Sequence, residues 1–374
     1  MKVVRSFKFA IRPSRTQAAA LDAMLGDCCA LYNAALEQRI TAYRRCGVSL
    51  NYSKQCAELK AVRSDDPDFA RWGFTTLQQV LRRLDKTFSA FFKRGKGFPR
   101  FRSRARFDSL DMRLSDGLTI RKTGRIRVVG VPGEIKVRWH RAMPDGAKVS
   151  HAVLSRKSGK WFICFRVEWD EAVAVHPGLT VGIDLGLNSL IATSEGEAIA
   201  APRFARTASS KLRRHQRALA RCKKGSKRRI KAKKRLAVAS ARIANQRRDF
   251  AHKLTRSLVD RFSLIAFENL NLNGLRRGKM ARSVHDAAWS QIIQFATYKA
   301  ESAGGSVVLV NARGTSQTCP DCGDTKPKKL SERTHRCDCG CVLDRDVAAA
   351  KIVLQRAISG LETSLRTSSQ RVAA

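Results

Sequence analysis

The stretch LTVGIDLGLNSLIAT, residues 179–193, constrains the fold of this chain more than any other. An apolar run rich in β-branched residues ends in Asp184, and a second apolar run follows a short turn that contains Gly186. This pattern predicts two buried strands joined by a tight turn. A carboxylate in a buried strand loses its hydrating water, which is costly unless a cation or hydrogen-bond donors replace that water. Asp184 is therefore either a satisfied structural carboxylate or a metal ligand.

Two later acids occupy similar places. Glu268 ends the apolar run 264–267, and Asp346, with Asp344 two residues before it, precedes an Ala-rich amphipathic helix. Acids on two strands and a helix start can converge into one cluster of oxygen ligands, which Mg²⁺ prefers. Two such ions about 3.5–4 Å apart activate the attacking water and stabilise the leaving oxygen in phosphodiester hydrolysis. In their order these acids resemble those of an α/β, RNase H-like (RuvC) nuclease domain, which is the fold expected here.

A group of cysteines precedes the third acid. Cys319 and Cys322 have the C-x-x-C spacing that lets two thiolates bind one tetrahedral zinc ion. The second pair is less regular, because three further cysteines follow at every second residue: Cys337, Cys339 and Cys341. Cys341 or His335 could replace one member of that pair. The spacing predicts a zinc ribbon with four ligands in the loop that leads to the third acid.

The charge of the chain indicates its partner. It carries 73 Lys and Arg residues against 31 Asp and Glu residues, a formal net charge of +42, which a polyanion is expected to neutralise. No apolar run approaches the ~18 residues of a membrane span, and the N-terminus has no signal-peptide core. Nucleic acid is therefore the expected partner, over a long contact, and no membrane is expected. The odd number of cysteines, 11, predicts a reduced, intracellular protein.

Residues 91–107 form one of two strongly basic segments. This loop is broken by Gly and Pro and has interleaved aromatic residues. It is either a solvated connector or a phosphate-binding loop, and phosphate contact is favoured because its cations have no acidic partner within the segment. The contacts expected from this loop are Lys93, Arg94, Arg100 and Arg102.

Residues 211–256 form the second basic segment, with 19 Lys and Arg residues and one acid, Asp249. The pattern predicts two amphipathic helices around a Lys-Gly-Ser turn. Salt bridges within the helices cannot neutralise a segment of almost one sign, so the hairpin is expected to lie along a nucleic-acid backbone. The expected contacts at its turn are Lys223, Lys224, Lys227 and Arg228. Its apolar residues are expected to be buried: Leu212, Leu219, Ile230, Leu236, Ile243 and Phe250.

The first part of the chain predicts β-structure with a helical insertion. Residues 1–12 alternate as a strand, and a capping box at Ser14 begins a helix that ends near Gly47. Further helices are expected over 52–64 and 74–94. Between about 108 and 170 apolar and polar residues alternate with a period of two, which is typical of strands, and a hairpin is expected to turn at Ser158-Gly159. The pattern predicts a β-barrel that the helices interrupt.

The segment after Glu268 is expected to be a loop over 269–279. A single helix is then expected from about Ser283, with Asp286 in its first turn, where an acid needs no catalytic role. A strand follows over 306–312, and the chain beyond about 356 is expected to be a short helical or frayed tail.

Three blocks together resemble one known family. GIDLG, AFENLNLNGLRR and TSQTCPDCG…HRCDCGCVLDRDVAAA resemble, in order and spacing, the TnpB (OrfB) proteins of insertion sequences, relatives of the type V CRISPR effectors. The resemblance covers nearly the whole chain and implies an RNA-guided DNA endonuclease with one RuvC active site. Its partners would be a guide RNA and double-stranded target DNA, bound by a monomer in the bacterial cytoplasm near the nucleoid. The protein would read a short flanking motif, and base pairing would read the target.

The resemblance also implies roles by position. Tyr52 and Gln78 stand where family members contact the flanking motif, although both also suit ordinary helix-surface positions. The acids that would hold two Mg²⁺ ions and catalyse cleavage are Asp184, Glu268 and Asp346. The cysteines that would bind zinc are Cys319, Cys322, Cys337 and Cys339. The implied domains are a wedge β-barrel (1–12 and 108–175), a helical recognition domain (13–107), a RuvC-like domain (176–312) with the basic hairpin (205–258), a zinc ribbon (313–342) and a last RuvC helix with its tail (343–374).

One departure from the family keeps other functions open. Ala348 stands where family members usually have Asn, a residue that could support the metal site from outside its ligand shell. One alternative is therefore an RNA-guided DNA-binding repressor that cleaves weakly or not at all. A second alternative is a DNA transposase, because RNase H-like transposases also use three acids.

Overall fold

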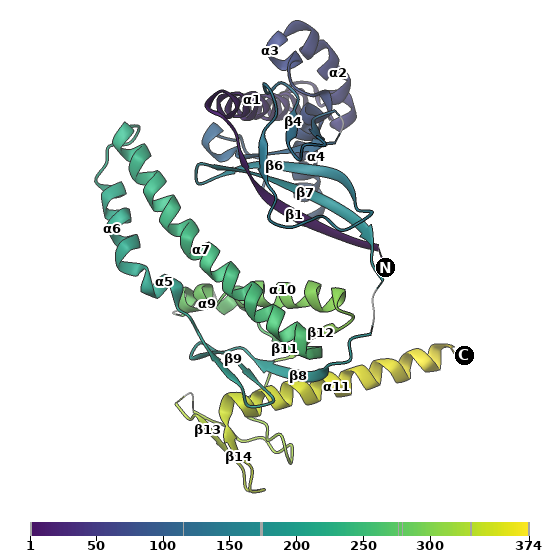
Figure 1. Ribbon diagram of the computed structural model, residues 1–374, viewed down its shortest axis with the longest axis vertical. Coiled ribbons are helices and arrows are strands. Elements are labelled where there is room, and N and C mark those ends of the chain that lie inside the picture. The colour runs from purple at the N-terminus through teal and green to yellow at the C-terminus, as the bar shows by residue number, and fades with distance from the viewer. Residues whose placement is uncertain are drawn as a thin grey trace. The chain divides into compact units, whose positions relative to one another are not determined.

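The computed structural model divides the chain into two compact units, Met1–Glu171 and Ala172–Ala374 (Figure 1). It describes residues 2–114, 116–172, 175–275, 277–278, 280–329 and 331–372, and the side chains of Asn273 and of residues 364–372 lie outside this description. Each unit has a hydrophobic core of its own. Among the described residues, no helix is long and apolar enough to cross a membrane.

The longer helices of the first unit, α1, α2 and α4, lie where the sequence predicts them, whereas α3 and a 3₁₀ turn were not predicted. Helix α1 begins after Ser14, whose side chain and that of Gln17 form the predicted capping box, and ends at Gly47 with a left-handed φ of 66°. Helix α4 buries Leu77, Val80, Leu81 and Leu84 on one face. The bounds are α1 (Arg15–Cys46), α2 (Tyr52–Asp65), α3 (Pro67–Ala70), α4 (Phe74–Arg94) and the 3₁₀ turn Arg104–Arg106.

The strands of the first unit form a five-stranded antiparallel sheet in the order β2-β6-β7-β1-β5. Their bounds are β1 (Lys2–Arg12), β2 (Ser109–Arg113), β5 (Lys136–Arg138), β6 (Lys148–Lys157) and β7 (Lys160–Asp170). The hairpin turns at Ser158 and Gly159, both with positive φ, as predicted. A second pair, β3 (Leu118–Ile120) and β4 (Ile126–Val128), connects to this sheet through the isolated bridges Ile126↔Ile135 and Leu114↔Leu118. Closure into a barrel stays a prediction.

The second unit is built on a mixed sheet in the order β10-β9-β8-β11-β12. Its strands are β8 (Leu179–Asp184), β9 (Ser189–Thr193), β10 (Ala198–Ala200), β11 (Phe262–Asn269) and β12 (Ser306–Asn311). Strands β8, β9 and β10 pair antiparallel, whereas β11 pairs parallel with both β8 and β12. The strand–turn–strand motif predicted for residues 179–193 is therefore present, with β8 at the centre of the sheet.

Helices cover both faces of this sheet. On one face, Ile265 and Phe267 of β11 join a core with α7 (Lys227–Arg261) and α10 (Trp289–Ser302). On the other face, Ala266 packs with Val353 of α11 (Arg345–Val372). Gly182 of β8 permits this contact, because a Cβ there would lie 2.0 Å from the carbonyl oxygen of Ala350. The predicted tail is thus the continuation of one long helix.

The second unit also contains the helix α6 (Ser209–Ala220) and the shorter helices α5 (Phe204–Thr207), α8 (Leu272–Leu275) and α9 (Ala281–Ala287). The prediction of a loop over 269–279 was partly wrong, because α8 occupies four of these residues; Arg276 and Lys279 lie outside the described residues. The prediction of one helix from Ser283 was also wrong. Ala288 has a left-handed φ of 55° and separates α9 from α10, which places Asp286 in the last turn of α9.

The basic hairpin forms as predicted, but its apolar residues are less buried than expected. Helices α6 and α7 pack along each other, which covers only one side of each helix. Ile243 is buried, four of the other expected residues are half-buried, and Ile230 is 63% exposed. The prediction that Ile230 is buried was therefore wrong. Its position near the turn leaves it beyond the sheet and α10, which cover the far end of α7.

Candidate carboxylate and cysteine sites

Asp184 and Glu268 lie beside each other at one edge of the second sheet. Asp184 is the last residue of β8, and Glu268 lies near the end of β11. The parallel register pairs Phe267 with Ile183, so the next residues of the two strands are neighbours. Glu268 is buried, with 6% of its surface exposed. The two acids therefore emerge where the carboxyl ends of adjacent parallel strands meet.

Asp346 reaches the same edge from the first turn of α11. Its Oδ2 lies 4.0 Å from the position that a Cβ would take at Gly186, in the turn after β8. Burial raises the pKa of Asp184 to about 8, and repulsion from Glu268 and Asp346 contributes to the rise. The structure thus brings together Asp184, Glu268 and Asp346, which we call the acid cluster.

The pKa values of the other two acids are raised as well. Burial raises the pKa of Glu268, although a hydrogen bond from Thr315 and the charge of Arg356 oppose the rise. Burial followed by repulsion from Asp344 raises the pKa of Asp346. Glu268 is buried and Asp184 and Asp346 are half-buried, and the negative charge of three such carboxylates is one that a divalent cation would balance.

Thr315 is a site residue that sequence reasoning missed. Its hydroxyl donates to Oε1 of Glu268, and the side chain is 4% exposed. The only sequence signal was its place in the TSQTC block, four residues before Cys319. Because the contact joins β11 to the segment after β12, no local pattern could have indicated it.

Two further acids of the second unit have structural roles. Oδ1 of Asp344 accepts hydrogen bonds from the backbone N–H groups of Asp346 at 2.9 Å and Val347 at 3.2 Å, and it therefore caps α11. Asp286 accepts from the backbone N–H of Ala205 at 2.9 Å and forms an ion pair with Arg247 at 2.8 Å. Asp286 thus joins α9 to α5 and α7.

Arg345 connects the acid cluster to the segment that carries the cysteines. Its Nη1 donates to the carbonyl oxygens of Lys329 at 2.9 Å and Glu332 at 3.2 Å, and its backbone N–H donates to the carbonyl oxygen of Arg333 at 2.8 Å. Its charge lowers the pKa of both Asp184 and Asp346, against the stronger effect of burial. One side chain therefore contacts the cysteine-bearing loop and acts electrostatically on two acids.

Four cysteines form a second cluster between β12 and α11, beside the short hairpin of β13 (Thr334–Arg336) and β14 (Val342–Asp344). The sulfur of Cys319 lies 3.6 Å from that of Cys339, and the sulfur of Cys322 lies 3.5 Å from that of Cys337. All four sulfurs lie within 4.8 Å of one another. A tetrahedral zinc ion with Zn–S bonds of about 2.3 Å separates its sulfurs by about 3.8 Å, so this cysteine cluster suits zinc.

The electrostatics of the cysteine cluster also suit a cation. Burial opposes ionisation of Cys319, but hydrogen bonds from the backbone of Cys322 and Asp321 lower its pKa to about 5. Gly323 makes the required tight turn with a left-handed φ of 78°. Backbone hydrogen bonds oppose the rise, but contacts with neighbouring thiols raise the pKa of Cys322, and burial together with neighbouring thiols raises the pKa of Cys339 to about 12. A cation would therefore be needed to hold all four cysteines as thiolates.

The alternative ligands lie close by on the buried side of the same site. His335 and Cys341 form a second group with Cys319, and all three side chains are buried. This group has three donors, whereas the four cysteines complete a tetrahedron by themselves. The amino group of Lys328 contacts Nδ1 of His335. Zinc binding through that nitrogen would therefore displace the lysine. The choice of Cys337 and Cys339 stays a prediction.

The predicted nucleic-acid contacts lie on both units. Tyr52 and Gln78 are half-buried in the first unit, and the hydroxyl of Tyr52 accepts from Arg82 at 3.4 Å. The predicted cations of both basic segments are exposed: Lys93, Arg94, Arg100, Arg102, Lys223, Lys224, Lys227 and Arg228. The four in the second unit surround the turn between α6 and α7. Their exposure is compatible with phosphate contact but does not test it.

Sequence comparison finds relatives along nearly the whole chain. A protein of Streptomyces pristinaespiralis, provisionally named an RNA-guided DNA endonuclease, is 33% identical over 361 residues, which are 94% of this chain and 89% of the relative. InsQ of Escherichia coli K12, with the same provisional name, is 28% identical over 360 residues, which are 90% of this chain and 88% of InsQ.

Three family profiles also match parts of the chain. They describe a probable transposase (OrfB of IS605) over residues 162–278, a Cas12f1-like TNB domain over 289–353 and a helix-turn-helix domain over 1–47. The second range contains the cysteine cluster and the start of α11. Within the third range the described residues form a strand and one 32-residue helix rather than two helices.

A solved structure has a similar mixed α/β fold. The chain resembles the protein in the cryo-EM structure of a Cas12f1–sgRNA–target DNA complex with a TM-score of 0.57 and 12% sequence identity. The similarity covers 90% of this chain and 82% of the other. At this identity it concerns the fold alone, and it extends over both compact units.

Proposed function

This chain belongs to the TnpB (OrfB) family of IS605 insertion sequences, and from that premise we propose that it is an RNA-guided DNA endonuclease. The observation that carries the proposal is the convergence of the acid cluster from three segments distant in the sequence. The provisional names of the two relatives and the nucleic acids in the Cas12f1 complex support the same activity. The net charge of +42 supports a large contact with polyanions.

The second unit is proposed to be the RuvC-like nuclease domain. Its sheet has three antiparallel strands followed by two that run parallel to the first, in the spatial order 3-2-1-4-5. An RNase H-like fold carries its acids on the first strand, the fourth strand and a late helix, where Asp184, Glu268 and Asp346 lie. The first unit would then hold the wedge and recognition parts.

The acid cluster is proposed to hold Mg²⁺. When bound, the metal would supply an activated water and stabilise the leaving oxygen of the cleaved phosphodiester. The protein's own contribution is to bury Glu268, to place Asp184 and Asp346 half-buried beside it, and to orient Glu268 through the hydroxyl of Thr315. Arg345 and Arg356 lower the acids' pKa only in part, so most of the compensating positive charge is left for the metal to supply.

The cysteine cluster is proposed to hold one structural zinc ion through Cys319, Cys322, Cys337 and Cys339. The cluster lies in the loop that ends at Asp344 and Arg345, directly before Asp346. Zinc would therefore fix the path of the chain into α11. A guide RNA and double-stranded target DNA are the proposed partners of a monomer in the bacterial cytoplasm.

The proposal is tested by purifying the protein under native conditions and sequencing the RNA that accompanies it. We expect one discrete RNA with a structured 5′ part and a variable 3′ end. The complex, loaded with an RNA of chosen 3′ sequence, should cleave a plasmid that carries the matching target when Mg²⁺ is present. A smear of random RNA fragments, together with cleavage that ignores the 3′ sequence, would overturn the guided activity.

Two alternatives are separated by the same assay. A repressor would bind the matching plasmid without cutting it, and the observation that favours it is the buried Ala348 in place of the usual Asn beside Asp346. A transposase would join DNA ends, as the description of the matching OrfB profile suggests. Gel analysis of the products distinguishes bound, cut and joined DNA.

A further inference from the structure

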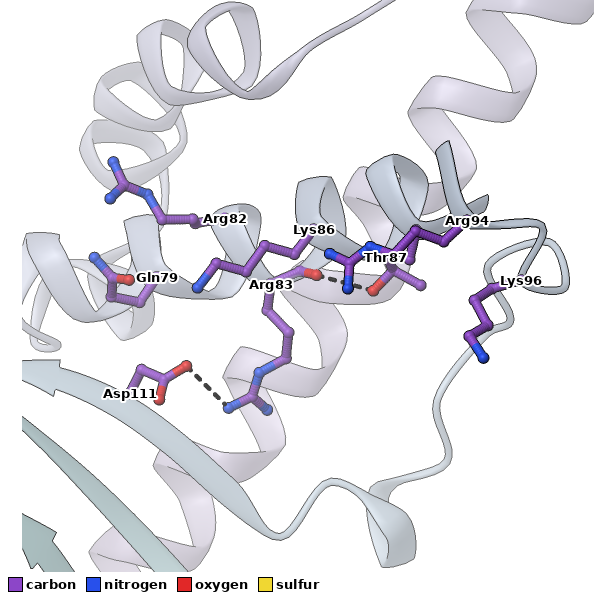
Figure 2. A pocket seen from close by; sticks show the side chains of 9 residues that line it. Gln79, Arg82, Arg83, Lys86, Thr87, Arg94, Lys96 and Asp111 are labelled. Carbon is purple, nitrogen blue, oxygen red and sulfur yellow. Dashed lines mark hydrogen bonds and ion pairs between the residues drawn. The ribbon is translucent and has the colours of Figure 1, made fainter. Parts of the chain in front are cut away.

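Helix α4 and the chain after it line an open cavity of about 430 Å³ in the first unit (Figure 2). Its lining includes five cations and one acid: Arg82, Arg83, Lys86, Arg94, Lys96 and Asp111. We call this cavity the α4 groove. A cavity with such an excess of positive charge is suited to an anion.

Two of the five cations are already held within the unit. Arg83 forms an ion pair with Asp111 at 3.5 Å and donates to the carbonyl oxygen of Ser109 at 2.8 Å. Arg82 lies against Tyr52, with its guanidinium 4.9 Å from the centre of the ring. These contacts fix both side chains without neutralising Arg82.

The other three cations have no such partner. Within the described part of the chain, the side chains of Lys86, Arg94 and Lys96 form no hydrogen bond or ion pair. In Figure 2 they lie along one side of the groove, at α4 and just beyond its end. Like charges that lie together without counter-charges repel one another, so their arrangement contributes nothing to the stability of the unit.

The local sequence explains how these cations come to share one groove. Lys86 and Arg94 are eight residues apart on α4, which places them about 12 Å apart along the helix axis. Thr87 and Ala90 between them are small, and the Thr87 hydroxyl is occupied by the carbonyl oxygen of Arg83 at 2.9 Å. Gly95 ends the helix with a left-handed φ of 59°, which turns the chain so that Lys96 also lines the groove.

The dimensions of the groove indicate the kind of anion. Duplex nucleic acid carries one phosphate per strand every ~3.4 Å of its axis, so a 12 Å row of cations spans roughly three phosphates. Side chains that donate to phosphates position a nucleic acid without reading its bases. The groove is thus matched to an extended sugar–phosphate backbone rather than to a single nucleotide.

We propose that the α4 groove binds the phosphodiester backbone of one nucleic-acid strand through Lys86, Arg94 and Lys96. Arg82 and Arg83 line the groove as side chains already fixed by Tyr52 and Asp111. The proposal adds Lys86 and Lys96 to the cations predicted from sequence and leaves Lys93, which does not line the groove, outside it. It rests on the proposed function only in expecting a nucleic-acid partner.

The test compares two triple variants of equal charge. The groove variant is Lys86→Gln/Arg94→Gln/Lys96→Gln. The control variant is Lys60→Gln/Lys122→Gln/Lys136→Gln, at three exposed lysines of the same unit that do not line the groove. Binding of fluorescent single-stranded RNA, duplex DNA and an RNA–DNA hybrid is measured against salt concentration without Mg²⁺, so that no cleavage interferes.

We expect the slope of log K against log[salt] to fall by about 2 in the groove variant for at least one of the three probes, because each lost phosphate contact lowers it by about 0.7–0.9. The control variant should keep the wild-type slope within about 0.5. The probe that shows the fall identifies the strand that occupies the groove. Equal slopes for the two variants with all three probes would overturn the proposal.

Thermal unfolding separates this result from misfolding. Because the three side chains have no partner among the described residues, the groove variant should melt at or above the wild-type temperature. A lower melting temperature would instead assign the cations a structural role and overturn the proposal. The measurement also stands apart from the proposed function: a groove that binds RNA or DNA in a protein without guided cleavage would leave this inference intact.

Discussion

The acid cluster and the cysteine cluster both bring like charges together in the second unit, but the chain holds them by different means. The acids come from β8, β11 and α11, and burial raises the pKa of Asp184 to about 8. The four cysteines all lie in one loop, in a stretch of 21 residues. Burial opposes ionisation of Cys319, but backbone hydrogen bonds lower its pKa to about 5. The sheet resists ionisation of its acids, whereas the loop favours ionisation of this thiol.

This difference indicates what each cluster requires from its ion. The acid cluster is positioned by strand pairing and by the packing of α11 on β8, so its geometry should persist without metal. In the described part of the loop that carries the cysteine cluster, the named strands are short, β13 and β14, and Arg345 contacts the backbone of the same loop. Its ordered structure should therefore depend on zinc, because metal binding and folding of such small segments are coupled.

The largest expected effect comes from Asp184→Asn. We expect target cleavage to fall by about 10³-fold or more, because an amide cannot supply the charge that a catalytic metal requires. RNA-dependent DNA binding should remain within about twofold of wild type, and gel-shift and cleavage assays on the same complex check both. The matched control is Asp344→Asn, which keeps a side chain able to cap α11 and should cleave nearly normally. Loss of binding in Asp184→Asn would mean that the acid is structural.

The second prediction concerns zinc. Cys339→Ser should lower the zinc content from about one ion per chain to a small fraction and should expose residues 319–341 to proteolysis. The sheet should remain folded, since Glu268 and Asp184 do not depend on that loop for their position. Cys341→Ser is the control and should keep its zinc. The reverse pattern in elemental analysis would place Cys341 in the ligand set instead of Cys339.

The sequence predicted the parts of this comparison that depend on local patterns. Asp184 and Glu268 could be placed at strand ends because the apolar runs before them are continuous, and the C-x-x-C spacing indicated a metal-binding turn. The capping box at Ser14 likewise fixed the start of α1. Each of these signals acts over a few residues, so tertiary contacts do not alter it.

The sequence did not predict features that depend on packing between segments. The left-handed Ala288 breaks the expected helix without a Gly or Pro to indicate it, and Asp286 consequently pairs with Arg247. Ile230 fits an apolar stripe but is exposed near the turn between α6 and α7. Thr315 contacts Glu268 across 47 residues of sequence. The connection made by Arg345 is of the same kind, because its partners lie in the cysteine-bearing loop.

The third prediction tests whether the two clusters are connected. Arg345→Gln should lower cleavage at saturating DNA by about 10–100-fold and raise the Mg²⁺ concentration needed, because a residue that supports metal ligands typically has an effect of this size. Zinc content and DNA affinity should stay unchanged. Arg336→Gln, at an exposed position of β13, is the control. Unaltered Mg²⁺ dependence in Arg345→Gln would show that the clusters act independently.

The smallest expected effect is on stability as a function of pH. The folded chain without Mg²⁺ keeps the Asp184 proton up to about pH 8, whereas the unfolded chain releases it near pH 4, so the free energy of unfolding should fall as pH rises between these values. Mg²⁺ should therefore raise the melting temperature more at pH 8 than at pH 5, by about 2–4 °C for each 1 kcal/mol of binding free energy.

Asp184→Asn provides the control for this effect, because an amide does not titrate and the variant should lose much of the pH dependence. The scans need buffers without chelator, so that zinc stays in the cysteine cluster and only the acids respond. If Mg²⁺ stabilised wild type and variant equally at both pH values, the acids would not be the source, and the metal would be acting elsewhere on the chain. If the stabilising effect of Mg²⁺ came from the cysteine cluster, Cys339→Ser would remove the Mg²⁺-dependent rise in melting temperature together with the zinc.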